Sequence, residues 1–214
     1  MREPADLLFD LDGTISDPLD GIFRSFNFAL NSHGFEPVPE KAIAALVGPP
    51  LDDGFRSLVP GADDRQIQSL VSTYRERYAD SGFAENRIYD GVSEALSELK
   101  ERGLVLGVCT SKRRDFAEMI LELFGIRGRF AFVDGGDIGV KKQEQIAALA
   151  GAGLVSKSSR MIGDRAVDIV AARANGLSSV GVLWGYGSES ELREAGANVI
   201  LRHAKELSQL VGAA

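Results

Sequence analysis

The chain has 214 residues, 44% of them apolar and 26% charged, with a formal net charge of −7 and one cysteine. This length suits one large domain or a medium domain that carries an insertion. The acidic balance argues against a broad nucleic-acid surface, because a phosphate backbone favours basic patches, but a locally positive site can still bind a small phosphate. A single cysteine excludes an internal disulfide, and no apolar run is long enough for a transmembrane helix. No signal peptide is expected either, so the sequence predicts a cytoplasmic protein, a monomer or small homo-oligomer, with no membrane or nucleic-acid partner.

The first predicted element is a short buried strand at residues 7–9, which is followed by Asp10, Asp12, Gly13 and Thr14. In a parallel α/β sheet, ligands bind outside the carboxyl ends of the strands, so both carboxylates are expected to face a binding site. Two acids held together cost free energy unless a cation or a shared proton offsets them. The alternative is that Asp12 and Gly13 form only a turn.

Residues 16–85 carry helical signals and no strand signal of comparable quality. Helices are expected over residues 18–33 and 63–78, and over residues 40–47 with an end at Gly48-Pro49-Pro50. We interpret this stretch as a helical cap, inserted directly after the first strand and its two carboxylates, an arrangement that suits a lid.

Strands and helices alternate from residue 91 onward. Strands are expected over residues 104–109, 130–133, 160–162, 179–183 and 198–201, and helices over residues 91–102, 116–124, 143–150, 166–174, 189–194 and the C-terminal stretch. This alternation implies βαβ units, and short apolar strands fit a parallel sheet covered on both faces. The predicted fold is therefore α/β, with a three-layer Rossmann-like parallel-sheet core (residues 1–15 and 86–214) and an inserted helical cap (residues 16–85).

Polar and basic groups follow two of the later strands. Thr110 and Ser111 come directly after the second strand, and Lys112 begins a run of three basic residues that oppose the dipole of the next helix. Lys141 and Lys142 lead into the helix after the third strand. An ammonium can bridge a carboxylate and a phosphate, so an anion site is indicated here. Helix caps and solvated surface lysines are the alternatives.

A further pair of acids follows the fourth strand of the predicted sheet. Asp164 leaves that strand as Asp10 leaves the first, and Gly163 before it permits close approach of the backbone. Asp168 lies one helical turn later on the same face. Acids at a helix start can simply cap it. Carboxylates that converge at strand ends, however, form a hard oxygen site suited to Mg²⁺.

Taken together, these residues resemble the four motifs of the haloacid dehalogenase superfamily of phosphohydrolases. The first motif is similar to Asp10-Leu11-Asp12-Gly13-Thr14, the second to Thr110, the third to Lys142 or Lys141, and the fourth to Gly163-Asp164 through Asp168. The motifs occur in the right order and the resemblance covers nearly the whole chain. Alignment on Ile146 favours Lys142 over Lys141.

Two further segments resemble the branch of this superfamily that contains phosphoglycolate phosphatases and 5′-nucleotidases. Gly48-Pro49-Pro50-Leu51 is similar to the cap loop of that branch, and residues 181–188 are similar to its late glycine-rich turn. Phosphoglycolate phosphatases usually carry Lys-Pro at the third motif, whereas Lys142 here precedes Gln143. This departure favours the nucleotidase-like side.

The resemblance implies a mechanism and a role for each motif residue. Asp10 would be the nucleophile that forms an aspartyl-phosphate, and Asp12 would protonate the leaving oxygen and then deprotonate the attacking water. Mg²⁺ would be held by Asp10, the Asp12 backbone carbonyl and Asp164, while Asp168 would lie further out and orient a metal-bound water or a lysine. The groups expected at the phosphate or substrate are Thr110, Lys142, Leu11, Gly13, Thr14, Ser111 and Lys112.

The expected activity is therefore magnesium-dependent hydrolysis of a small phosphorylated metabolite. A sugar phosphomutase on the same scaffold and a catalytically silent phosphate-binding protein are the alternatives. Phe26, Phe28, Phe55 and the Gly48-Pro49-Pro50 loop give the predicted cap apolar and aromatic material against which a base or a sugar ring could pack. Most of these aromatic side chains are expected to belong to the cap's own core. A nucleoside 5′-monophosphate is therefore slightly favoured over phosphoglycolate.

Overall fold

The chain divides into two compact units that are linked by two crossings of the backbone. The computed structural model describes residues 3–48, 50–136 and 140–210. Met1–Asp17 and Ile88–Ala214 form the core, and Pro18–Arg87 form the cap. Each boundary of the cap lies two residues later in the chain than the boundary predicted from the sequence. At the two crossings, the strands β2 (Ser16–Asp17) and β3 (Arg87–Ile88) pair in a small sheet of their own.

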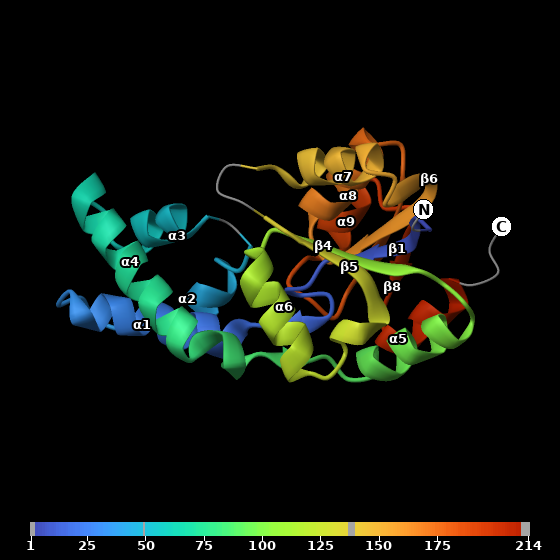
Figure 1. Cartoon of the computed structure of the whole chain (residues 1–214). Helices are drawn as coiled ribbons and strands as arrows, with labels where there is room; N and C mark the ends of the chain where they lie inside the picture. The colour runs from blue at the N-terminus through green and yellow to red at the C-terminus, as the bar shows by residue number, and fades with distance from the viewer. Residues whose placement is uncertain (1–2, 49, 137–139, 211–214) are drawn as a thin grey trace. The chain divides into compact units, whose positions relative to one another are not determined.

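The core contains a six-stranded sheet in the order β5-β4-β1-β6-β7-β8 (Figure 1). Its strands are β1 (Ala5–Phe9), β4 (Leu106–Thr110), β5 (Phe130–Gly135), β6 (Val155–Gly163), β7 (Ser178–Val182) and β8 (Val199–Leu201). All neighbouring strands pair in parallel. In the register of the central strand, Leu8 lies opposite Gly107 of β4 and Met161 of β6. The carboxyl ends of these three strands therefore meet at one edge of the sheet.

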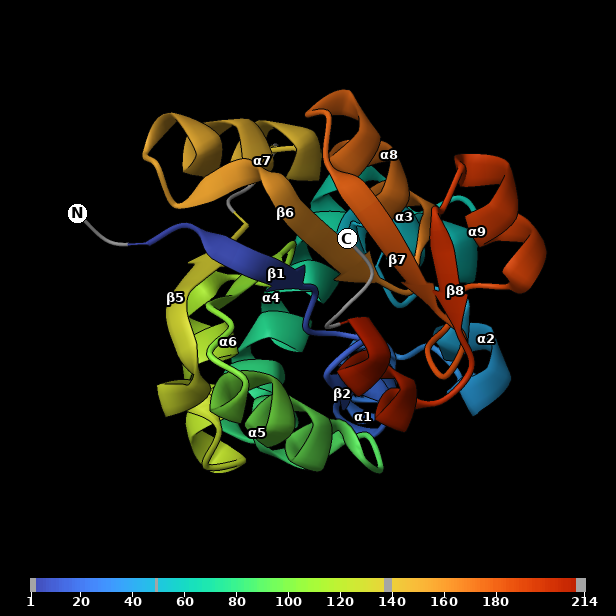
Figure 2. The same ribbon diagram turned by 90° about the vertical axis from the view of Figure 1, so that its right-hand side faces the viewer.

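Helices cover both faces of this sheet, as Figure 2 shows. One face carries α7 (Lys142–Gly151), α8 (Ala166–Ala174) and α9 (Glu189–Ala195). The other carries α5 (Val92–Glu101), α6 (Arg114–Leu123) and the 3-10 helix η3 (Ala204–Leu210). The predicted three-layer α/β core is confirmed. The helix predicted at the C-terminus is the 3-10 helix η3 in the described residues.

The centre of the core is closely packed around β1. Leu8, Cys109, Phe132, Ile146 and Met161 belong to one buried cluster. Burial raises the pKa of the Cys109 thiol to about 12, so this side chain stays protonated and packs as a small apolar group. Within the described residues, no helix is both long and apolar enough to cross a membrane.

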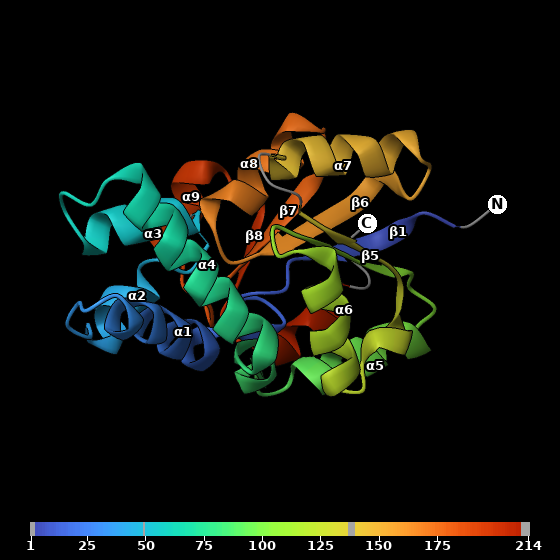
Figure 3. The same ribbon diagram turned by 60° about the vertical axis from the view of Figure 1, so that its left-hand side comes forward.

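The cap consists of helices, as the sequence predicts. Its elements are α1 (Leu19–Ser32), α2 (Glu40–Ala44), α3 (Leu51–Leu58), α4 (Asp64–Asp80) and the 3-10 helix η1 (Gly82–Glu85). Helices α1 and α4 pack side by side (Figure 3). Helix α4 begins with a capping box in which the side chains of Asp63 and Gln66 each accept a backbone N–H of the other residue. Helix α3 has no counterpart in the sequence-based prediction, and Pro49 of the predicted cap loop lies outside the described residues.

Aromatic side chains form the interior of the cap. The ring of Phe26 lies 4.7 Å from that of Phe55 and 4.9 Å from that of Tyr74, measured between centroids. Phe26 and Phe55 are fully buried in this cluster, whereas Phe28 is half exposed. Phe26 and Phe55 therefore pack the cap itself, as expected for most of its aromatic side chains, and neither ring offers a surface for a substrate ring.

The packing around β1 leads to a stability prediction. Leu8→Ala is expected to lower the free energy of unfolding by about 2–5 kcal/mol, because it leaves a cavity beside residues that cannot close it. Leu123→Ala is the matched control, since that side chain is 53% exposed on α6, and a loss of only about 0.5 kcal/mol is expected. Urea unfolding followed by circular dichroism measures both. Equal losses in the two variants would contradict the central position of Leu8.

Candidate active site

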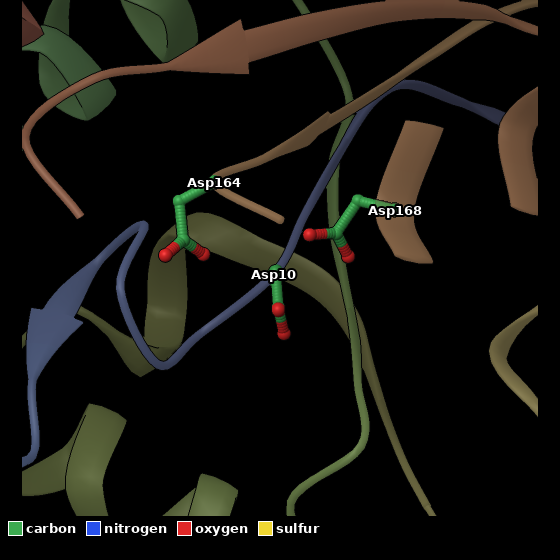
Figure 4. Close-up of side chains that lie close together, drawn as sticks. All are labelled: Asp10, Asp164 and Asp168. Atoms are coloured by element: carbon green, nitrogen blue, oxygen red, sulfur yellow. The ribbon is translucent and has the colours of Figure 1, made fainter. Parts of the chain in front are cut away.

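Three buried carboxylates converge at the carboxyl edge of the core sheet. Asp10 directly follows β1, Asp164 directly follows β6, and Asp168 lies in the first turn of α8. Each offers an oxygen atom, and these oxygens all lie within 4.8 Å of one another. Figure 4 shows the three side chains gathered in this way. The neighbouring positions of β1 and β6 in the sheet bring together Asp10 and Asp164, which are 154 positions apart in the chain.

Lys142 is the cation of this cluster. Its ammonium lies 2.9 Å from Asp10 Oδ2 and also pairs with Asp168 Oδ1, and the side chain is almost fully buried. Burial opposes the charge on Lys142, but the carboxylates of Asp10 and Asp168 outweigh it and raise the pKa of the lysine. Lys141 is exposed at the N-cap of α7. Of the two candidate lysines, only Lys142 is therefore placed among the carboxylates.

Asp168 holds Lys142 in position. One of its oxygens pairs with the Lys142 ammonium, and the other accepts a hydrogen bond of 3.1 Å from the backbone N–H of Arg165. Gly163 leaves room for the carboxyl group, because a Cβ at this position would lie 2.2 Å from Asp168 Cγ. Of the two roles expected for Asp168, these contacts support the orientation of a lysine.

Asp12 is paired with a second lysine. Lys112 Nζ lies 2.8 Å from Asp12 Oδ2, whereas Asp12 Oδ1 is buried without a hydrogen-bond partner among the described residues. Burial raises the pKa of Asp12, and the nearby Lys112 only partly offsets this effect. Asp12 is thus easier to protonate than an ordinary aspartate. Lys112 was expected beside the phosphate, and in this structure its ammonium contacts the carboxylate of Asp12.

The groups expected to hold the phosphate are partly engaged with one another. Thr110 is buried at the end of β4, and its Oγ1 accepts a hydrogen bond of 3.2 Å from the backbone N–H of Lys112. The Leu11 N–H donates to Asp10 Oδ1 at 2.8 Å, and Ser111 is exposed. The hydroxyl of Thr110 therefore organises the loop after β4, in addition to any contact with a ligand.

Gln145 is a site residue that the sequence analysis did not identify. Its Nε2 donates to the Thr110 carbonyl at 3.1 Å and to Asp134 Oδ2 at 3.3 Å, so α7 is attached to the ends of both β4 and β5. The sequence feature that could have identified Gln145 is its position. It is a polar residue one helical turn after the two lysines, where helical periodicity predicts the buried face of the helix.

Asp164 is enclosed by neutral hydrogen-bond donors. Its Oδ1 accepts a hydrogen bond of 3.4 Å from the Thr14 hydroxyl, and its Oδ2 accepts one of 2.8 Å from the Tyr186 N–H. Gly13 has φ +81°, and a Cβ there would lie 2.2 Å from Asp164 Oδ2, so glycine is required at this position. Burial and the charge of Asp10 together raise the pKa of Asp164 to about 7.

With this geometry established, comparison with known proteins defines the class of protein. Residues 7–182 match the model of the family described as haloacid dehalogenase-like hydrolase. The chain belongs to this family.

Three curated relatives span most of the chain. A 5′-nucleotidase of Pseudomonas aeruginosa is 39% identical over 197 residues, which cover 90% of this chain and 88% of that protein. The tyrosine-protein kinase PtkA of Mycobacterium tuberculosis is 35% identical over 214 residues, which cover 98% of this chain and 72% of that protein. A phosphoglycolate phosphatase of Xanthomonas campestris is 32% identical over 194 residues, which cover 87% and 86% of the two chains.

A solved structure supports the same classification. The crystal structure of a predicted phosphatase from Clostridium acetobutylicum superposes with a TM-score of 0.86 at 34% identity, covering 98% of this chain and 99% of that chain. The family membership and the phosphatase relatives confirm the predicted class of enzyme, a phosphatase of the haloacid dehalogenase-like type.

The raised pKa of Asp164 predicts how metal-free stability changes with pH. The folded protein holds a proton on Asp164 up to about pH 7, whereas an unfolded aspartate loses it near pH 4. The stabilising contribution is therefore present at low pH and is lost as the pH rises through 7. Asp164→Asn is expected to raise the Tm by several degrees at pH 8 in EDTA, with little change at pH 5, in thermal unfolding. The same shift at both pH values would contradict the raised pKa.

Proposed function

We propose that this protein is a magnesium-dependent phosphomonoester hydrolase that forms an aspartyl-phosphate on Asp10. Its proposed substrate is a small phosphorylated metabolite, with a nucleoside 5′-monophosphate favoured. The observation that carries the proposal is the cluster at the sheet edge, where buried Asp10 contacts Lys142 and lies within 4.8 Å of Asp164 and Asp168. A carboxylate that is meant to attack a phosphate dianion needs such cationic surroundings.

The residues of the cluster fit a divalent cation. Asp168 already contacts Lys142 and the Arg165 amide. Within the described parts of the chain, the hydrogen bonds that the Asp164 oxygens accept come from neutral donors, and the pKa of Asp164 is raised. The negative charge near Asp10 and Asp164 is therefore incompletely offset, and carboxylate oxygens are the ligands that Mg²⁺ prefers. Asp10, Asp164 and the Asp12 backbone carbonyl would hold the ion. When bound, Mg²⁺ would neutralise charge on the nucleophile and on the phosphoryl group.

In the first step, a carboxylate oxygen of Asp10 attacks phosphorus and the bond between phosphorus and the ester oxygen breaks. Asp12 donates its proton to that leaving oxygen, so the alcohol departs neutral. Its raised pKa favours the protonated form that this step requires. The pairing of Asp12 with Lys112 is then suited to the carboxylate that remains after the transfer.

In the second step, Asp12 accepts a proton from water as the water oxygen attacks phosphorus. The bond between Asp10 and phosphorus breaks, and inorganic phosphate leaves while Asp12 is protonated again. Lys142 and the loop after β4, with Thr110 and Ser111, would bind the phosphoryl oxygens in both steps. Positioning and electrostatic stabilisation provide most of the catalysis in this chemistry.

Two observations favour a nucleoside 5′-monophosphate over phosphoglycolate. Identity to the Pseudomonas 5′-nucleotidase is 39%, against 32% for the Xanthomonas phosphoglycolate phosphatase. Lys142 is followed by Gln143, whereas phosphoglycolate phosphatases usually have proline at that position. The aromatic rings of Phe26 and Phe55 no longer support this preference, because they are buried in the cap.

Asp10→Asn is expected to abolish turnover, because an amide cannot form the acyl-phosphate although it occupies nearly the same volume. Release of phosphate from a phosphomonoester should fall to the uncatalysed background. The free energy of unfolding is measured alongside to show that the variant is folded. Near-normal activity in a folded variant would exclude the covalent mechanism.

The two lysines provide a matched pair for a second prediction. Lys142→Ala is expected to lower kcat by about a hundredfold or more, on the scale of losing one donor to a transition-state oxyanion. Lys141→Ala removes an exposed ammonium one residue earlier and should change kcat less than about twofold. Steady-state kinetics on both variants, with Tm as a check on folding, makes the comparison. The reverse order would show that the third motif is displaced by one residue.

The experiment that tests the proposal is a substrate panel with and without the metal. Nucleoside 5′-monophosphates, phosphoglycolate and sugar phosphates are supplied with Mg²⁺ or with excess EDTA, and products are separated by chromatography. We expect free phosphate, loss of activity in EDTA, and the highest kcat/KM for a nucleoside monophosphate. A preference for phosphoglycolate would reverse the substrate assignment. Isomerised sugar phosphate without free phosphate would identify a mutase, and full activity in EDTA would exclude the metal.

A further inference from the structure

The loop after β7, which contains Trp184 and Tyr186, contacts the carboxylate of Asp164. Trp184 Nε1 donates to the Thr14 carbonyl at 2.9 Å, and two residues later the Tyr186 N–H donates to Asp164 Oδ2 at 2.8 Å. The loop therefore contacts the chain after β1 and the acid after β6 at the same time. The group that contacts Asp164 is the backbone N–H of Tyr186, so the position of the loop fixes the direction of this hydrogen bond.

Two glycines in this loop allow the close approach. A Cβ on Gly185 would lie 2.2 Å from the Gly13 carbonyl oxygen and 2.5 Å from Asp164 Oδ2. A Cβ on Gly187 would lie 1.8 Å from the Asp164 carbonyl oxygen. Since real side-chain carbons do not come this near to backbone oxygens, both positions require glycine. The loop is thus fitted closely against Asp164 on both sides of Tyr186.

The side chain of Tyr186 fastens the loop to the strand that leads into the cap. Its hydroxyl donates to Asp17 Oδ1, and Asp17 is the last residue of the core before the cap begins. Tyr89 lies just after the chain returns to the core, and its backbone N–H donates to the Ile15 carbonyl at 3.2 Å. The Tyr186 side chain is therefore attached to the residue at which the chain leaves the core.

We propose that Tyr186 is a positioning residue for Asp164: its hydroxyl, held by Asp17, fixes the loop whose backbone N–H orients the Asp164 carboxylate. This assignment rests on the proposed role of Asp164 as a metal ligand. Partners of a ligand carboxylate orient it, and their loss weakens metal binding although they never touch the ion. The same hydroxyl joins the metal site to the residue at which the chain leaves the core.

The test is Tyr186→Phe, which keeps the ring, the backbone N–H and the burial but removes the hydroxyl. Calorimetric titration of Mg²⁺ into the metal-free protein is expected to show a Kd weakened by about tenfold. At saturating Mg²⁺, kcat and KM should return to near the wild-type values, because the hydroxyl contacts neither substrate nor ion. A purely structural role would lower the Tm and leave the Mg²⁺ affinity unchanged.

Asp17 supplies an independent variant and a coupling test. Asp17→Ala removes the acceptor and should weaken Mg²⁺ binding about as much as Tyr186→Phe, whereas Asp17→Asn keeps an acceptor oxygen and should largely retain affinity. The double variant Tyr186→Phe/Asp17→Ala should bind no more weakly than either single variant, since both remove the same hydrogen bond. Tyr78→Phe makes the same chemical change in the buried interior of the cap, and it should leave the Kd unchanged.

The outcomes separate this inference from the proposed function. If the wild-type protein does not bind Mg²⁺, the proposed metal site fails. If the wild type binds Mg²⁺ and Tyr186→Phe binds it equally well, the positioning role of Tyr186 is overturned while the metal site stands. Additive losses in the double variant would also overturn it, because Tyr186 and Asp17 would then act separately.

Discussion

The constraint on which this site depends is the burial of three carboxylates around the Lys142 ammonium. Taking these charges out of water costs free energy that only close pairing and hydrogen bonding can offset. Asp168 and Asp10 are offset by Lys142, whereas Asp164 has neutral donors and a raised pKa. Once Asp164 is deprotonated, three carboxylates face one ammonium, so the cluster carries excess negative charge. A divalent cation would neutralise this charge. Repulsion among the carboxylates destabilises the metal-free protein, and its removal would favour the metal-bound protein.

The second requirement of the site is that backbone segments can closely approach the carboxyl groups of Asp164 and Asp168. Gly13, Gly163, Gly185 and Gly187 all lie against Asp164 or Asp168 at distances that leave no room for a Cβ. The loops after β1 and β7 and the last residue of β6 therefore pack directly on the acids, and backbone N–H groups are among the partners of both carboxylates. Rigid elements give such a site its precision, since each loop begins at the end of a paired strand. The Tyr186 hydroxyl extends this arrangement to Asp17.

The candidate site lies within one of the two compact units of the chain. Every residue of the candidate site belongs to the core unit, and the cap has its own aromatic interior built from α1, α3 and α4. The phosphate chemistry can thus be argued from the core alone. The proposed preference for a nucleoside 5′-monophosphate is inferred from sequence similarity and from Gln143, which follows Lys142. Phe26 and Phe55 do not contribute to this inference, because both rings are buried in the cap.

The sequence by itself determined the α/β core, its element order and the acids and lysines at the strand ends. Those features are local, since apolar periodicity and the residues just after a strand can be read without knowing what lies across the sheet. The register to Ile146 already favoured Lys142 over Lys141, and the tertiary structure added the contacts of its ammonium with Asp10 and Asp168. Only the tertiary structure showed the contacts of Gln145 and placed Tyr186 between Asp164 and Asp17. These are contacts between residues far apart in the chain, which no local pattern encodes. Which aromatic rings of the cap are buried was likewise settled only by the structure, because exposure is a property of the packed fold.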